Sequence, residues 1–84
     1  MRTLEQLRKE IDDIDKQLKA LLDSRFTLSG EVGSFKKQQG LPVKDAQREQ
    51  RILTSIQEDS ALKHGGEISR VYHAIFQASR ELQE

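Results

Sequence analysis

The sequence predicts an all-α protein of three helices, because apolar residues recur every three or four positions over three separate segments. The predicted helices span residues 3–37, 45–58 and 67–84, and no segment shows the alternation typical of a β-strand. The connecting segments are short and contain Gly or Pro. The 84 residues are therefore predicted to form one domain, residues 1–84.

The first predicted helix is too long for a compact monomer. At the usual rise per residue, helix 3–37 would measure roughly 50 Å. A compact chain of this length has a radius of gyration of only about 12 Å. Part of the apolar side of the helix would therefore remain uncovered, and a second copy would cover it. The prediction is an intertwined homodimer.

Helix 3–37 has recognisable start and stop signals. Thr3 is a predicted N-cap, and Gln6 stands three residues later as its capping-box partner. Gly30 and Gly33 lie inside the helix, where each costs about 1 kcal/mol relative to Ala. They indicate a close approach of another backbone or space for a ligand. The segment 39–42, Gln-Gly-Leu-Pro, ends the helix as a turn.

The other two helices are shorter and amphipathic. Asp45 is the predicted N-cap of helix 45–58, whose apolar side is narrow. Residues 59–66 read as a loop that ends in two glycines. Ser79 falls within the apolar stripe of helix 67–84, and Gln83 lies one turn beyond it. The apolar members of that stripe are Ile68, Val71, Tyr72, Ile75, Phe76 and Leu82.

Composition excludes several classes of function. Fourteen basic and fourteen acidic residues cancel, which argues against nucleic-acid binding. No apolar run is long enough to cross a membrane, and the start shows no signal-peptide pattern. The absence of Cys excludes disulfides and thiolate zinc sites. His64 and His73 have no metal-ligand spacing around them. We expect a cytoplasmic protein without a metal site.

One cation interrupts the apolar stripe of the first helix. Arg25 takes the position between Leu21 and Leu28 that the spacing assigns to an apolar residue; the apolar members of the stripe are Leu4, Leu7, Ile11, Ile14, Leu18, Leu21, Leu28, Val32 and Phe35. A guanidinium stays protonated and is costly to bury without an anion. The stripe contains no acidic residue, so the partner is either a carboxylate of another helix or a ligand.

Further polar residues share the side of Arg25. Lys36 follows it by eleven residues, about three turns, with Ser29 and Val32 between them. The second helix places Asp45, Arg48 and Glu49 on one face. Together with Ser79 and Gln83 these residues would form a small cationic pocket. Such a pocket suits a compact dianion that also carries a hydroxyl group.

Arg8 is the fourth cation that stands out. It precedes Arg25 by seventeen residues, roughly 25 Å along the axis, so one chain cannot bring both to one small ligand. In an antiparallel pair of long helices, Arg8 of the partner subunit would approach Arg25. The predicted site is therefore shared between subunits.

Each of these residues also has a purely structural explanation. An Arg in a helix seam can fix register, and Lys36 can be an ordinary solvated side chain. Asp45, Arg48 and Glu49 can be an N-cap with an exposed ion pair, and Ser79 can bond to the preceding turn. Their occurrence together favours a binding site.

The ordered set of segments resembles the all-helical chorismate mutases. The matching segments are residues 7–11 (Leu-Arg-Lys-Glu-Ile), 21–25, 31–33 with Lys36, 42–45 with Arg48 and Glu49, and Ser79 with Gln83. The resemblance implies an intertwined dimer of three-helix domains with two active sites. It also implies the Claisen rearrangement of chorismate to prephenate, a reaction that requires no nucleophile or cofactor.

The resemblance implies three groups of contacts with the substrate. The carboxylates would be held by Arg25, Arg48, Ser79 and Arg8 of the partner subunit. The ether oxygen of the breaking bond would meet Lys36 and Gln83. The ring hydroxyl would be held by Glu49 and the backbone at Asp45. Lys36, Gln83, Arg25 and Glu49 are the expected catalytic residues.

Three alternatives remain at this point. An isochorismate pyruvate lyase would use a related fold and a similar set of cations, although Glu49 favours the mutase. The ending, residues 78–84, resembles mutase domains fused to another aromatic-pathway enzyme such as DAHP synthase, and such a domain can sense chorismate or prephenate. The third alternative is a helical dimerisation module without a ligand.

Overall fold

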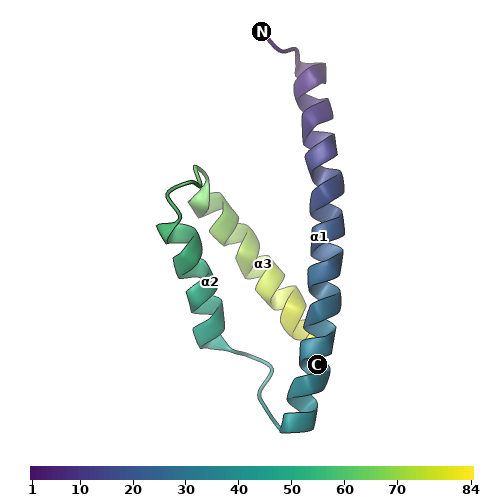
Figure 1. Cartoon of the computed structure of the whole chain (residues 1–84), viewed down its shortest axis with the longest axis vertical. Helices are drawn as coiled ribbons and strands as arrows, with labels where there is room; N and C mark the ends of the chain where they lie inside the picture. The colour runs from purple at the N-terminus through teal and green to yellow at the C-terminus, as the bar shows by residue number, and fades with distance from the viewer.

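The computed structural model describes residues 1–84 and contains three α-helices and no strand (Figure 1). The helices are α1 (Leu4–Gln39), α2 (Ala46–Glu58) and α3 (Gly65–Gln83). The all-α prediction with three helices is confirmed. The chain is elongated, with principal extents of 56 × 26 × 15 Å and a radius of gyration of 16.1 Å. This radius exceeds the roughly 12 Å of a compact chain of equal length.

Local signals explain both ends of α1. The Thr3 hydroxyl accepts the Gln6 amide at 3.2 Å, and the Gln6 side chain accepts the Thr3 amide at 2.9 Å. This is the capping box that the sequence predicts. At the other end Gly40 has φ 67°, a left-handed conformation that a glycine adopts without strain. The chain thus leaves the helix at Gly40 and turns toward α2.

The start of α2 agrees with the sequence, whereas α3 begins earlier than expected. The Asp45 carboxylate accepts the Arg48 amide at 3.0 Å and caps α2. Helix α3 begins at Gly65, so the two glycines predicted to end the loop lie in its first turn. The Ile68 amide bonds to the His64 carbonyl at 3.0 Å, and a Cβ on Gly65 would lie 3.6 Å from the Ile56 carbonyl oxygen. The first turn of α3 thus forms beside the end of α2, despite the low helix propensity of glycine.

Helix α3 packs against both other helices, which do not pack directly on each other (Figure 1). The apolar core is small and consists of Ile56, Ile75 and Phe76. At the far end of α3, a Cβ on Gly33 would lie 2.6 Å from the Gln83 Cα. Gly33 is therefore required for the close approach of α1 and α3, one of the two functions predicted for the helix glycines.

The apolar stripe of α1 is uncovered. Its nine apolar residues keep between 38% and 68% of their surface exposed. The N-terminal part of α1 projects beyond the other helices, as Figure 1 shows. The stripe predicted for α3 is also only partly buried, because Val71 and Leu82 are exposed while Ile75 and Phe76 are buried. The chain alone has too few apolar partners for these surfaces.

No helix of the chain combines the length and the apolar character needed to cross a bilayer.

Candidate active site

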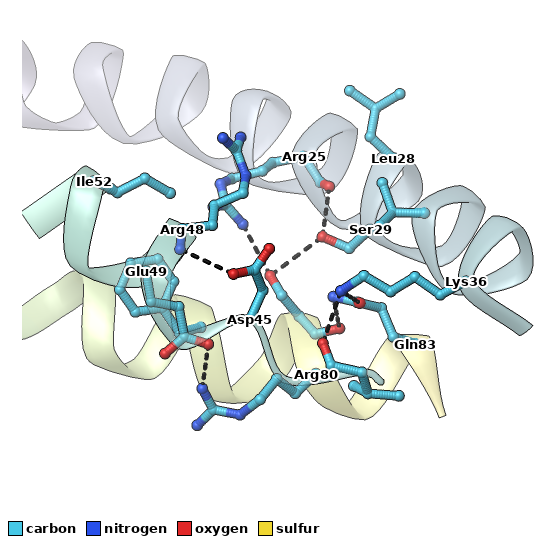
Figure 2. A pocket seen from close by; sticks show the side chains of 14 residues that line it. Arg25, Leu28, Ser29, Lys36, Asp45, Arg48, Glu49, Ile52, Arg80 and Gln83 are labelled. Atoms are coloured by element: carbon cyan, nitrogen blue, oxygen red, sulfur yellow. Dashed lines mark hydrogen bonds and ion pairs between the residues drawn. The ribbon is translucent and has the colours of Figure 1, made fainter. Parts of the chain in front are cut away.

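All three helices border one polar pocket of about 400 Å³ (Figure 2). The pocket lies between the C-terminal part of α1, the start of α2 and the end of α3. Its polar lining consists of Arg25, Ser29, Lys36, Asp45, Arg48, Glu49, Ser79, Arg80 and Gln83. The structure thus brings together seven of the eight residues that the sequence predicts for the site. The exception is Arg8, which is exposed near the N-terminal end of α1.

Arg25 has no carboxylate partner within the chain. Its Nη1 donates to the Ser79 hydroxyl at 2.9 Å, and its guanidinium carbon lies 5.8 Å from the centre of the Tyr72 ring. Neither ion pair of the chain includes Arg25. Two neutral groups hold the side chain in place, but its charge is not neutralised. Of the two partners that the sequence allows, the carboxylate of another helix in the same chain is thus absent.

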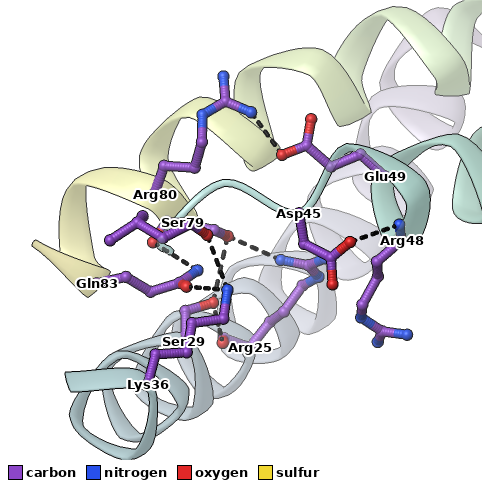
Figure 3. A network of polar contacts seen from close by, with 10 residues as sticks. Arg25, Ser29, Lys36, Asp45, Arg48, Glu49, Ser79, Arg80 and Gln83 are labelled. Atoms are coloured by element: carbon purple, nitrogen blue, oxygen red, sulfur yellow. Dashed lines mark hydrogen bonds and ion pairs between the residues drawn. The ribbon is translucent and has the colours of Figure 1, made fainter. Parts of the chain in front are cut away.

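Two buried hydroxyls support this arginine. Ser29 donates to the Arg25 carbonyl at 3.1 Å, and its Oγ lies 3.2 Å from the Oγ of Ser79. Both serines are buried at the contact of α1 and α3. A serine hydroxyl donates one hydrogen bond and can accept two, so each of these hydroxyls can donate and accept at the same time. The serine pair therefore contacts both the side chain and the backbone of Arg25, as seen in the contact network of Figure 3.

Lys36 and Gln83 meet across the gap between α1 and α3. Lys36 Nζ donates to Gln83 Oε1 at 2.8 Å and to the Val43 carbonyl at 2.7 Å. Gln83 Nε2 donates to the Ser79 carbonyl at 3.2 Å. An ammonium has three N–H groups and an amide nitrogen has two. One donor on each side chain thus has no partner within the chain, and the two side chains are adjacent (Figure 3).

The α2 side of the pocket carries the acidic residues. Asp45 is engaged as the N-cap of α2. Glu49 Oε2 lies 2.5 Å from Nη1 of Arg80, which comes from α3. Four cations and two carboxylates line the pocket, so its formal charge is +2. A site of this charge favours a small dianion.

The sequence pattern does not identify three residues of the site. Ser29 stands out in the sequence only as a small residue between the two cations of α1. Val43 contributes its backbone carbonyl. Because every residue has a backbone carbonyl, the residue type does not predict this contact. Arg80 is separated from Glu49 by 31 positions, and charged residues on a terminal helical turn are common. The one available signal for Arg80 is that it follows Ser79, already assigned to the pocket.

The family comparison covers nearly the whole chain. Residues 7–84 match the family model described as chorismate mutase type II.

Individual relatives agree with this match. The chain is 32% identical over its full length to a bifunctional chorismate mutase/prephenate dehydratase of Aquifex aeolicus, of which it spans 25%. It is 36% identical over 55 residues, 66% of the chain, to a chorismate mutase of Methanocaldococcus jannaschii, of which the match spans 56%. Among solved structures, a conserved hypothetical protein from Pyrococcus furiosus is 33% identical with a TM-score of 0.83, over 100% of this chain and 99% of that one.

Proposed function

Because the chain belongs to the chorismate mutase type II family, we propose that it rearranges chorismate to prephenate in the pocket between its three helices. The observation that carries the proposal is a pair of cations that lack a counter-ion. Arg25 and Lys36 both line the pocket, and all of their hydrogen-bond partners are neutral. A substrate with two carboxylates and an ether oxygen supplies the missing negative charge.

The first contribution to catalysis is restraint. The open-chain end of chorismate must fold over its ring before the new carbon–carbon bond can form. Arg25 and Ser79 would hold one carboxylate, with Arg48 beside them, and fix this folded conformation. Positioning of this kind removes part of the entropic barrier of the reaction. The Ser29–Ser79 pair supports this role because it keeps Arg25 in one orientation.

The second contribution is electrostatic. As the carbon–oxygen bond breaks, negative charge develops on the ether oxygen. The unused donors of Lys36 and Gln83 would meet that oxygen, and they stabilise it more in the transition state than in the ground state. Glu49 and the backbone at Asp45 would hold the ring hydroxyl on the α2 side. No step requires a nucleophile.

We further propose that the working unit is a homodimer with shared sites. Leu28 and Val32 line the pocket and yet expose 60% and 45% of their surface, so the pocket lacks a wall on this side. A second α1 packed on the exposed stripe would supply that wall and bury the apolar residues. In an antiparallel arrangement Arg8 of the partner subunit would reach the second carboxylate of the substrate.

The decisive experiment is the loss of chorismate absorbance on addition of purified protein. We expect the unaltered chain to consume chorismate and Lys36→Ala to lose about 10²–10³-fold in kcat, as for other single donors to a developing oxyanion. Lys37→Ala is the matched control, because the Lys37 side chain is exposed and makes no hydrogen bond or ion pair. Circular dichroism should show unchanged helix content in both variants. Normal turnover by Lys36→Ala would contradict the assignment.

A parallel incubation tests the lyase alternative. Isochorismate is offered to the same preparation, and salicylate is measured by its fluorescence. Glu49 lies on the α2 side, where it suits the ring hydroxyl of chorismate. If salicylate forms and chorismate is not consumed, the lyase activity would be assigned to the chain in place of the mutase activity.

The name of the Aquifex relative supports association with a second enzyme of aromatic amino acid biosynthesis. We propose that this domain works beside such an enzyme. Purified aromatic-pathway enzymes are added one at a time, beginning with DAHP synthase. We expect the partner enzyme to change the kcat for chorismate or to co-elute with the chain in gel filtration. Absence of both effects with each enzyme would contradict this proposal.

A further inference from the structure

We propose that Arg80 is a positioning residue, which holds the Glu49 carboxylate in place and thereby sets the affinity of the pocket for the hydroxyl-bearing ring of the substrate. The inference rests on the proposed function, because it assumes that Glu49 meets the ring hydroxyl of chorismate. It adds a residue that acts through another side chain.

The ion pair joins two different helices at the border of the pocket. Arg80 Nη1 on α3 lies 2.5 Å from Glu49 Oε2 on α2, and both residues line the pocket (Figures 2 and 3). Their side chains expose 30% and 22% of their surface. The other ion pair of the chain, between Arg2 and Glu10, lies at the start of α1 and is largely exposed. The pair at the pocket is thus the better shielded from solvent and the one placed to affect a ligand.

The pair divides the two oxygens of Glu49 between protein and ligand. Oε2 is engaged by Arg80, whereas Oε1 has no hydrogen-bond partner within the chain. A carboxylate oxygen is an acceptor, and the ring hydroxyl of the substrate is a donor. Arg80 thus leaves Oε1 to the hydroxyl and limits the rotation of the side chain before the substrate arrives. A preorganised acceptor loses less conformational entropy on binding.

Arg80 also corrects an electrostatic conflict. A carboxylate in a pocket for a dianion repels the ligand unless a cation accompanies it. Without Arg80 the formal charge of the lining falls from +2 to +1, and Glu49 faces the substrate uncompensated. Both effects act far from the breaking bond, in the ground state and the transition state alike. They therefore change KM more than kcat.

A purely structural role predicts a different result. An ion pair that is partly exposed to solvent contributes little to stability, and its loss would mainly lower the fraction of folded protein. That loss reduces the apparent kcat and leaves KM unchanged. The KM-against-kcat comparison therefore separates a positioning residue from a mere link between α2 and α3.

The test compares Arg80→Gln with Arg70→Gln, a substitution of the same kind on an exposed α3 residue without an ion pair. We expect Arg80→Gln to raise KM for chorismate about tenfold with little change in kcat, the size typical of one hydrogen bond to a charged group. Arg70→Gln should match the unaltered protein. Arg80→Lys should recover part of the loss, because it restores the charge but not the planar geometry of the guanidinium.

A double-mutant cycle completes the test. If Arg80 acts through Glu49, the double variant Glu49→Gln/Arg80→Gln should bind no worse than Glu49→Gln alone. Additive effects, or an unchanged KM in Arg80→Gln, would overturn the inference while the mutase activity of the unaltered chain remained. No consumption of chorismate by the unaltered chain would instead overturn the proposed function, and the inference with it.

Discussion

Substitution of Arg25 distinguishes a catalytic role of α1 from a purely structural one. Its guanidinium occupies an otherwise apolar stripe and finds only the Ser79 hydroxyl and the Tyr72 ring as partners. We expect Arg25→Leu to lose at least about a hundredfold in kcat/KM for chorismate, because a clamp for a substrate carboxylate is gone. Stability should be equal or higher, since the variant removes an unneutralised charge from a partly buried position.

The measurement combines chorismate turnover with urea unfolding at fixed protein concentration. Arg25→Lys serves as the control, because it retains the charge and loses the fork of donors. A simple dimerisation module would gain stability from Arg25→Leu and have no activity to lose. Retained turnover in Arg25→Leu would contradict the role of the residue as a clamp.

Residue type and spacing were sufficient to predict much of the pocket. Arg25 and Lys36 are three helical turns apart, so both project from the same side of the helix. Ser79 and Gln83 are polar residues on a core-facing stripe, and such residues need partners. The Lys36–Val43 and Glu49–Arg80 contacts could not be predicted in the same way. They depend on the path of the 40–45 segment and on how α2 lies against α3, and neither is encoded by a local pattern.

The two glycines of α1 differ in their packing, although they look alike in the sequence. A Cβ on Gly33 would lie 2.6 Å from the Gln83 Cα and 2.9 Å from its carbonyl oxygen. A Cβ on Gly30 would meet nothing within 4 Å. We expect Gly33→Ala to destabilise the fold by about 1–3 kcal/mol, because backbone atoms cannot move aside as a flexible side chain does. It should also reduce kcat, because it displaces Gln83 from Lys36.

Gly30→Ala is the matched substitution on the same helix. Since it removes a poor helix former without a clash within the chain, we expect it to stabilise the protein by up to about 1 kcal/mol. Urea unfolding of both variants at one protein concentration gives the comparison. Equal effects of the two substitutions would show that α1 and α3 do not approach as closely as described.

Element boundaries followed local chemistry where a cap was present. Thr3 and Asp45 start α1 and α2 as predicted because their side chains satisfy free amides at the helix ends. Helix α3 lacks a side-chain cap, and its first turn contains two glycines. The first turn lies beside the end of α2, and glycine propensity alone predicts a start two residues too late. Val71 and Leu82 remain exposed because α3 has only two neighbouring helices within the chain, and neither covers these side chains.

The whole chain is elongated and leaves a long apolar surface of α1 exposed. An extent of 56 Å with a core of three apolar residues leaves most of the α1 stripe in contact with water. Length and periodicity predicted this imbalance, because a helix of that length cannot be covered by two shorter ones. The relative orientation of two copies is not contained in the same pattern. If the proposed homodimer divides its site residues between subunits, activity measurements on mixed dimers would report on that orientation.

A mixture of two inactive variants tests the shared site. Arg8→Ala and Lys36→Ala each damage both sites of their own homodimer. If Arg8 acts in the partner subunit's site, a mixed dimer has one site with both defects and one site with neither. After unfolding and joint refolding at equal amounts, half of the dimers are mixed, so about a quarter of the unaltered activity should return.

A site that contains Arg8 of its own chain predicts a different outcome for the mixture. If Arg8 acts in the site of its own chain, no site in the mixed dimer is repaired, because each chain keeps its own defect. Activity after joint refolding would then equal the mean of the two separate variants. Refolding each variant alone controls for losses during the procedure, and sedimentation velocity confirms that the refolded species is a dimer. Recovery of activity thus depends on Arg8 of one chain completing a pocket that carries Lys36 of the other.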